Sequence, residues 1–284
     1  MKKKKGRLST ILLVVAFLAG LSLLLYPTVA DYWNSFHSSR AIAEYSDAVN
    51  KLTEEEYAAI LAEAEQYNRE IALRPKHAMS DSDMERYNSL LNFTGSGIMG
   101  KIEIPAIDVD LPIYHTTKDS VLQVGVGHVE WSSLPVGGET SHCVLSGHRG
   151  LPSARLFTDL DRLIVGDIFT LHVLNEVLTY EVDQILIVLP NEVSALELVS
   201  GKDYCTLVTC TPYGINTHRL LVRGHRIENM AQASESHIIA EAIQVEPAIV
   251  ATVVGIPILL LIMLFVLFSG GRKQKGSKRG GKNR

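Results

Sequence analysis

The chain has 284 residues, of which 46% are hydrophobic and 20% charged, with a formal net charge of −4 at pH 7. This length allows one large domain or two small ones with a packed core. Twelve of the 27 basic residues lie at the two ends of the chain, which leaves 15 basic residues against 31 acidic ones, a formal net charge of −16 in between. So acidic a central region argues against a nucleic-acid partner.

The N-terminal segment, residues 1–30, combines a basic start with an apolar run. Residues 8–26 carry no charge and follow five Lys and Arg residues. Such a segment can span a membrane or act as a secretory signal, and the small residues Thr28, Val29 and Ala30 would suit a signal peptidase. We therefore expect either a membrane anchor or a cleaved signal, and in both cases an exported central region.

A second uncharged run, Ala248–Phe268, has 21 residues. At ~1.5 Å per residue a helix of this length spans about 30 Å, the thickness of a bilayer core. We predict a transmembrane helix here, preceded by a linker at 231–247 and followed by a basic tail at 269–284. Basic flanks favour the cytoplasm, so we expect a cell-membrane protein with its central region on the extracellular face and its tail in the cytoplasm.

Residues 31–97 are predicted to form an N-terminal helical region. Apolar residues recur at helical spacing between Leu52 and Ala64, and Thr53 followed by Glu56 is a candidate capping box. We expect one or two amphipathic helices that serve as packing elements or as a stalk. The polar segment 75–100 is predicted to be an irregular loop.

From Ile102 onward the hydrophobic pattern changes to short runs rich in β-branched residues. Eight runs, broken by Gly and Pro, predict a closed or sandwiched β unit over residues 98–230. The predicted strands are Ile102–Ile104, Val109–Leu111, Val121–Val129, His142–Leu145, Ile168–Val173, Leu178–Val188, Tyr204–Cys210 and Leu220–Ile227. Short helices are expected near 154–161 and 193–198.

The chain has three cysteines, and an odd number in an exported protein leaves at least one thiol unpaired within the chain. On a strand from Tyr204 to Cys210, residue parity directs Cys205 and Cys210 to opposite faces, so they should not pair. Cys143 and Cys205 are interpreted as small buried hydrophobic residues. Cys210 lies at the end of its apolar run, where it is a candidate nucleophile or a structural thiol.

The segment 211–218 contains Pro, Gly and Asn, which predicts a hairpin loop with Cys210 and Arg219 at its two flanks. Directly opposed residues have Cβ atoms ~5 Å apart, so Arg219 is the expected neighbour of Cys210. Arg223 would lie about 13 Å further along the strand. A guanidinium beside a thiol favours the thiolate and can hold a developing oxyanion.

A proton carrier is still required, and His148 in the segment S-G-H-R-G is the best candidate. It follows an apolar run and stands between Gly147 and Gly150, which would leave its ring accessible to a substrate. The rival histidines are His142, His218 and His225. No Cys-x-x-Cys or His-x-x-x-His spacing supports a zinc site, and we expect no metal or cofactor.

Together the segments T-L-V-T-C-T-P (206–212) and S-G-H-R-G (146–150), Arg219, and the C-terminal apolar run with its basic tail resemble the sortases, and among them the class C, pilin-polymerising group. The resemblance implies a mainly β fold: an eight-stranded sortase-type β-barrel with N-terminal helices and two membrane-spanning segments. It also implies catalytic roles for His148, Cys210 and Arg219. The implied reaction is cleavage of an LPXTG-like sorting signal between Thr and Gly, followed by transfer to a lysine amine of another pilin subunit.

Many class C sortases carry an Asp-Pro-aromatic lid over the active site. The corresponding segment here reads Ser80-Asp81-Ser82-Asp83-Met84, without the proline or the aromatic residue. Asp81, Asp83 and Met84 form a possible lid, and a plain acidic loop is the alternative. We expect weaker self-inhibition than in relatives that carry the lid.

Three other functions fit parts of the sequence. One is a housekeeping-type sortase that anchors proteins to peptidoglycan, and another is a hydrolytic cysteine peptidase with the same three residues. The third is a non-catalytic, membrane-anchored binding protein, which would tolerate Cys210→Ala and Arg219→Ala.

Overall fold

The structure is a computed structural model that describes residues 2–73 and 79–229. Within it, the residues from Asp31 onward belong to one compact unit. The predicted linker, the predicted helix at 248–268 and the basic tail lie outside the described residues.

Three helices precede the sheet, whereas the hydrophobic pattern of 31–97 predicts one or two. They are α1 (Lys2–Val49), α2 (Glu54–Ile71) and α3 (Asp81–Ser89). Among the described residues, one helix, Ile11–Val49 within α1, is long and apolar enough to cross a membrane. The predicted second membrane span therefore stays a prediction.

The start of α2 confirms the predicted capping box. The Thr53 hydroxyl accepts a hydrogen bond from the Glu56 main-chain N–H, and the Glu56 carboxylate accepts one from the Thr53 N–H. Each interaction satisfies a main-chain donor that the first helical turn leaves without an intrahelical partner.

The prediction of an irregular loop over 75–100 is wrong for two parts of that segment, α3 and the start of the first strand at Ile98. The cause of the helix is a second capping box, in which Ser80 is the cap and Asp83 the reciprocal partner. Tyr87 then anchors α3, since its side chain is fully buried and its hydroxyl lies 3.0 Å from Nδ1 of His128.

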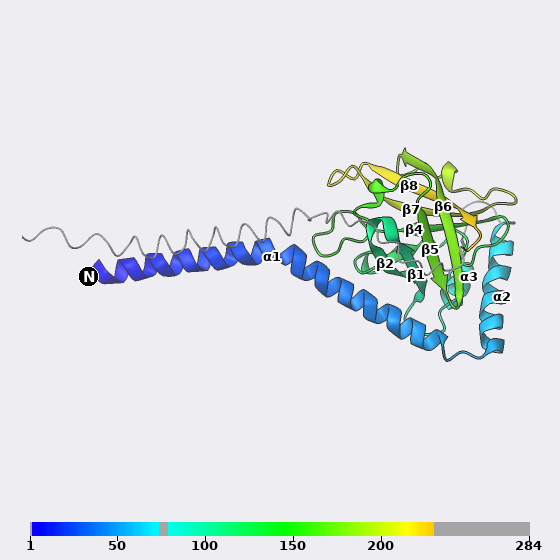
Figure 1. Ribbon diagram of the computed structural model, residues 1–284, viewed down its shortest axis with the longest axis horizontal. Helices are drawn as coiled ribbons and strands as arrows, with labels where there is room; N and C mark the ends of the chain where they lie inside the picture. The colour runs from blue at the N-terminus through cyan, green and yellow to red at the C-terminus, as the bar shows by residue number, and fades with distance from the viewer. Residues whose placement is uncertain (1, 74–78, 230–284) are drawn as a thin grey trace, which may run out of the picture. The chain divides into compact units, whose positions relative to one another are not determined.

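Eight strands close into a barrel in the order β1-β2-β3-β4-β7-β8-β6-β5 (Figure 1). The β2–β3 and β4–β7 pairs are parallel and the other pairs are antiparallel. The predicted strand number is confirmed, and the sheet is closed rather than sandwiched. The strands are β1 (Ile98–Ile104), β2 (Val109–His115), β3 (Val126–His128), β4 (Ser141–Ser146), β5 (Ile168–Val173), β6 (Glu176–Val188), β7 (Asp203–Thr211) and β8 (His218–Ile227).

Two local predictions need correction. The run Val121–Val129 is not one strand, because parallel strands β2 and β3 require a crossover, and α4 (Asp119–Leu122) forms part of it. No α-helix forms over 154–161, where Leu156 has a left-handed φ of 43° and only the 3₁₀ turn η2 (Leu160–Arg162) follows. The other 3₁₀ turns are η1 (Pro105–Ile107) and η3 (Ser194–Leu196), of which η3 lies within the predicted helix at 193–198.

The barrel interior is filled by alternate residues of the strands, as period-two patterning requires. Cys143 and Cys205 belong to this core, with exposed fractions of 2% and 0%, which confirms their interpretation as buried residues. The two residues occupy neighbouring positions in the register of the parallel strands β4 and β7, and both thiols are free. Large members of the core are Ile102, Ile113, Leu145, Phe169, Leu171, Leu207 and Val222.

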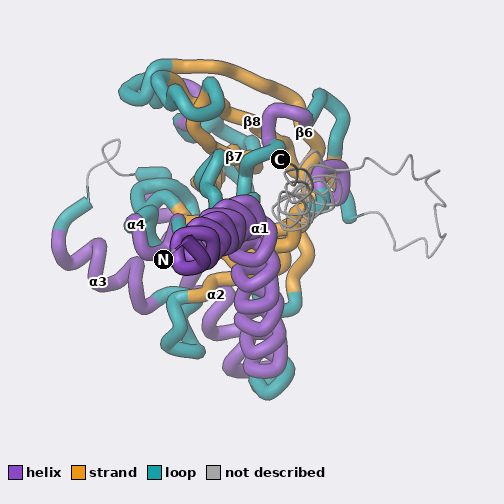
Figure 2. Tube along the Cα trace, turned by 90° about the vertical axis from the view of Figure 1, so that its left-hand side faces the viewer, coloured by secondary structure: helices purple, strands orange, loops and turns teal. Residues whose placement is uncertain are grey.

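The helices attach to the outside of the barrel through buried polar contacts. Asn68 of α2 accepts a hydrogen bond from the Leu134 N–H (2.7 Å) and donates to the Leu134 carbonyl (3.1 Å). Tyr45 of α1 donates to the Met99 carbonyl and accepts from the Leu174 N–H, both at 2.9 Å. Figure 2 shows β7 and β8 on the side of the domain away from α2 and α3.

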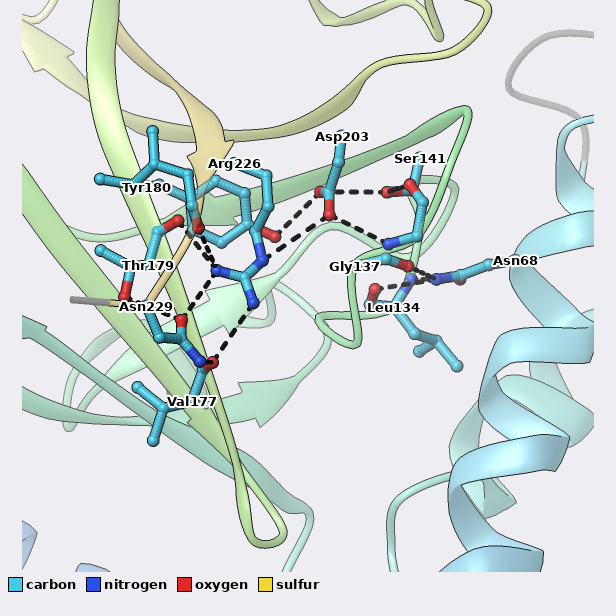
Figure 3. Close-up of polar contacts among 12 residues, drawn as sticks. Asn68, Leu134, Gly137, Ser141, Val177, Thr179, Tyr180, Asp203, Arg226 and Asn229 are labelled. Carbon is cyan, nitrogen blue, oxygen red and sulfur yellow. Dashed lines mark hydrogen bonds and ion pairs between the residues drawn. The ribbon is translucent and has the colours of Figure 1, made fainter. Parts of the chain in front are cut away.

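A polar network lies where β4 and β7 begin (Figure 3). The Asp203 carboxylate accepts hydrogen bonds from the hydroxyls of Tyr180 (3.0 Å) and Ser141 (3.2 Å), and Arg226 lies 4.0 Å away. Burial raises the pKa of Asp203. Cys210 lies at the opposite end of β7 from this network.

Candidate active site

Cys210 and Arg219 occupy directly opposed positions in the antiparallel pair β7–β8. This confirms the hairpin predicted from the sequence, although pairing extends one step further, to Thr211 and His218. The two side chains therefore start from neighbouring backbone positions on adjacent strands.

His148 reaches the same level from the other side of β7. Strands β4 and β7 are parallel and in register from Ser141↔Asp203 to Ser146↔Val208, a constant offset of 62 residues. The Gly147 N–H continues this contact by donating to the Val208 carbonyl at 3.0 Å. Continued past the end of β4, the same offset relates His148 to Cys210.

Residue parity along β7 also follows the prediction. Leu207 and Cys205 belong to the barrel core, whereas Val208 packs in a second cluster with Val144 and Leu221. Cys210 has the parity of Val208, so it points away from the core, and its free thiol is partly exposed. This is the placement that a nucleophile needs in order to meet an external substrate.

Arg219 and His148 are held by different kinds of contact. The Arg219 guanidinium donates to the main-chain carbonyls of His218 (3.1 Å) and Asn216 (3.4 Å), which ties it to its own hairpin loop. The His148 side chain is 31% exposed, and its Nε2 lies 3.9 Å from a carboxylate oxygen of Asp119, the first residue of α4. A histidine with a carboxylate beside one nitrogen can exchange a proton through the other.

The rival histidines occupy other places. His142 and His225 are both level with Tyr204, six residues before Cys210 and therefore ~20 Å from it along the strand. Burial lowers the pKa of His142, whose Nε2 lies 2.7 Å from the Thr206 hydroxyl. His218 is next to Arg219, and its Nδ1 lies 2.9 Å from the hydroxyl of its neighbour Thr217.

Arg223, four residues beyond Arg219 on β8, has a structural environment. It is opposed to Thr206 and forms two hydrogen bonds with the Asp183 carboxylate, at 2.9 and 3.0 Å. Its guanidinium lies 4.2 Å from the centre of the Tyr204 ring. An arginine paired and stacked in this way is not free to bind a reacting carbonyl.

The possible lid residues form the first turn of α3 rather than a loop. Asp83 accepts hydrogen bonds from the N–H and hydroxyl of Ser80, so one of its functions is to cap this helix. Met84 packs against the barrel core, and Asp81 is exposed at the first helical position. A lid role for these residues stays a prediction.

Two neighbours of the site were missed by the sequence reasoning. Asp119 lies 29 positions before His148, and no pattern in the sequence connects them. Arg149 directly follows His148 in the S-G-H-R-G segment, and its side chain is only 9% exposed. A basic residue between His148 and Gly150 was the signal for Arg149. Within the described part of the chain, no group of three or more His, Cys, Asp and Glu residues is arranged to hold a metal ion.

The arrangement thus combines a partly exposed thiol, a histidine and a guanidinium at one end of a barrel. Comparison with known proteins identifies the family of the chain. The family profile described as "Sortase domain" matches residues 102–227. The curated relative Sortase D of Bacillus subtilis (strain 168) is 34% identical over 131 residues, which cover 45% of this chain and 63% of the relative. The chain therefore spans somewhat less than two thirds of that relative.

Solved structures match over a larger region. The crystal structure of sortase C1 from Streptococcus agalactiae is 53% identical with a TM-score of 0.66, and the match covers 67% of this chain and 100% of that one. A crystal structure of Streptococcus pneumoniae sortase C, whose description refers to catalysis and pilin substrate specificity, is 43% identical with a TM-score of 0.62. That match covers 68% of this chain and 98% of the other. The chain belongs to the sortase family, and these structural neighbours are class C sortases.

Proposed function

We propose that this chain is a cysteine transpeptidase in which Cys210 is the nucleophile, His148 the proton carrier and Arg219 the carbonyl-binding group. The observation that supports the proposal is the strand register: Cys210 is opposed to Arg219 between β7 and β8, and His148 follows β4, the other neighbour of β7. Each supplies one requirement of acyl transfer: a nucleophile, a general acid and base, and a donor for the oxyanion.

In the proposed reaction the Cys210 sulfur attacks the Thr carbonyl of an LPXTG-like sorting signal. A C–S bond forms, the Thr–Gly bond breaks, and His148 gives a proton to the departing glycine amine. The acyl group remains on Cys210 as a thioester. A lysine amine from another subunit then attacks the thioester, His148 accepts the amine proton, the C–S bond breaks to release Cys210, and the new C–N bond is an isopeptide.

We propose pilin subunits as substrates, because the class C neighbours include a protein whose description refers to pilin specificity. The predicted C-terminal helix and basic tail support the same assignment by resemblance. The alternatives differ in the acceptor. A housekeeping sortase would use peptidoglycan, a hydrolase would use water, and a binding protein would use no acceptor.

The test is intact-mass analysis of the protein mixed with an LPXTG-type peptide, with Cys210→Ala as the control. We expect a mass increase equal to the peptide without its glycine end, and no increase in the variant. When lysine-bearing pilin is added, the peptide should leave Cys210 and appear as a conjugate with the pilin. Transfer of the peptide to water or to a peptidoglycan amine instead would contradict the assignment of pilin as the acceptor. Absence of any adduct would contradict the proposal that the protein is an enzyme.

For location, we propose that α1 anchors the catalytic unit at the outer face of the cell membrane. The helix carries Tyr32, Trp33 and Phe36 with exposed fractions of 73%, 66% and 57%, just after its most apolar part. Aromatic residues are enriched at the membrane interface. In a Trp131→Phe variant Trp33 is the remaining tryptophan, and its fluorescence should be quenched by brominated lipids around the full chain.

A further inference from the structure

The main-chain pairing between β4 and β7 ends before His148 is reached. The last residue pair of β4 and β7 is Ser146↔Val208, and the last main-chain bond runs from the Gly147 N–H to the Val208 carbonyl. His148 has left the strand, and its carbonyl accepts a hydrogen bond from the Phe157 N–H instead. Something other than the sheet must therefore keep His148 level with Cys210.

Two side-chain hydrogen bonds continue the register past this point. The Thr209 hydroxyl donates to the Gly147 carbonyl at 2.8 Å, and the Arg149 guanidinium donates to the Thr211 hydroxyl at 3.3 Å. Both pairs are separated by 62 residues, the offset of the β4–β7 ladder. The Gly147–Thr209 bond lies one residue before His148 and Cys210, and the Arg149–Thr211 bond lies one residue after them.

Arg149 makes two further side-chain contacts, with Asp161 and with Tyr213. Its guanidinium forms an ion pair with Asp161 from η2, and the guanidinium carbon Cζ lies 5.9 Å from the centre of the Tyr213 ring. Its side chain is 9% exposed, whereas Asp161 is 45% exposed. An arginine that is mostly shielded from solvent and already paired loses little further freedom when it binds Thr211, which suits a fixed support.

The backbone around Arg149 is shaped to allow these contacts. Gly150 has a left-handed φ of 78°, and a Cβ atom there would lie 2.9 Å from the Tyr213 ring. At Gly147 a Cβ atom would lie 2.6 Å from the Phe157 ring. The two glycines therefore let the His148 segment approach the β7–β8 loop and the segment before η2 closely.

We propose that Arg149, supported by Asp161, is a positioning residue that holds His148 level with Cys210 through its hydrogen bond to Thr211. Arg149 contacts neither the thiol nor the substrate in this role. The inference rests on the proposed transpeptidase function, since it concerns the proton carrier of that reaction. A displacement of about 1 Å in a catalytic group can cost on the order of 10²-fold in rate, so such a support has a large kinetic effect.

The sharpest test uses Thr211, because Thr211→Val removes the acceptor oxygen with little change of shape, whereas Thr211→Ser retains it. Arg149→Met and the double variant Arg149→Met/Thr211→Val complete a cycle. Arg155→Met is the matched control, since Arg155 forms an ion pair with Asp159 (2.6 Å) in the same segment. Each full-length protein is assayed for acyl-enzyme formation with an LPXTG-type peptide over a range of peptide concentrations.

We expect Thr211→Val and Arg149→Met to lower the maximal acylation rate by about 10-fold or more, with KM changed by less than about twofold. The double variant should be no slower than the slower single variant, because both changes break one link. Thr211→Ser and Arg155→Met should behave like the wild type. Additive losses in the double variant would overturn the proposal.

A second readout needs no substrate and is not moved by a purely structural role. The rate of Cys210 alkylation by iodoacetamide is measured against pH, and we expect the profile of Thr211→Val to be displaced from that of the wild type and of Thr211→Ser. A profile that coincides with the wild type overturns the proposal, whatever the acylation rate. If the wild type forms no acyl-enzyme, the proposed function fails, and alkylation alone then decides whether Arg149 positions His148.

Discussion

Cys210 and Arg219 face each other across the β7–β8 hairpin, whereas Arg223 on the same strand is paired with Asp183 and stacked on Tyr204. Arg219 and Arg223 therefore lie on the same strand, one at the site and the other in the framework. This difference makes the two residues a matched pair for mutagenesis.

Arg219→Ala should lower the acylation rate by roughly 10²–10³-fold, the usual effect of removing one oxyanion donor. Arg223→Lys keeps the charge and should leave acylation within about twofold of the wild type while lowering thermal stability. Single-turnover kinetics and a melting curve measure the two effects. Equal losses of acylation in both variants would contradict the assignment of Arg219.

Only one of the three thiols should react in the folded protein. Cys210 is partly exposed, whereas Cys143 and Cys205 are 2% and 0% exposed, and burial raises the pKa of Cys205 well above its usual range. Alkylation followed by mass analysis should give one label in the native state and three in denaturant. Cys210→Ala should give none in the native state, and a native label on Cys143 would show that the barrel opens.

Stability should fall as the pH decreases below neutrality, in part because of His142. Burial lowers its pKa in the folded state, so below pH ~6.5 the unfolded chain takes up a proton that the folded state does not. The contribution is fully present above that pH and is lost as the pH falls toward the folded-state pKa.

Urea unfolding of the wild type and of His142→Asn at pH 7.5 and pH 5 measures this contribution. The variant should lose less stability between the two pH values, while His218→Asn, at a partly exposed position, should lose as much as the wild type. An equal loss in all three proteins would assign the pH dependence to other groups.

Asn68 should be a stability determinant although it lies far from the site in the sequence. Asn68→Ala leaves the buried N–H of Leu134 without its partner, which should cost about 1–3 kcal/mol of unfolding free energy. Gln66→Ala removes only an exposed hydrogen bond to Glu70 and should cost less than about 0.5 kcal/mol. Chemical denaturation of the two variants checks the contrast, and equal costs would mean that α2 docks without Asn68.

The possible lid should have little effect on access to the thiol. Because Met84 packs on the core and Asp83 caps α3, we expect Asp81→Ala and Met84→Ala to change Cys210 alkylation by less than about threefold. Ser80→Ala serves as a control for loss of the helix cap, at about 1 kcal/mol. A large rise in labelling, in these variants or on deletion of residues 80–84, would show that the segment does cover Cys210.

Much of the local structure could be predicted from the sequence, because it depends on residues close together in the chain. The Thr53 and Glu56 capping box was predicted within one helical turn, and the opposition of Cys210 and Arg219 within one hairpin loop. The capping box at Ser80 and Asp83 has the same spacing but was missed, since the polar composition around it favoured a loop. The prediction of a strand from Val121 was wrong. The segment belongs to the crossover between β2 and β3, which is required because these two strands pair in parallel.

By itself the sequence determined which residues could do the chemistry, through residue types and spacings that act over a few positions. Only the tertiary structure decided that His148 stands level with Cys210. Strands β4 and β7 are neighbours in the barrel but are separated along the chain by β5 and β6, and no local pattern sets the register of such a pair. The contacts of Arg149 with Thr211 and Asp161, and of Asp119 with His148, exist because the closed barrel brings these segments to the same end.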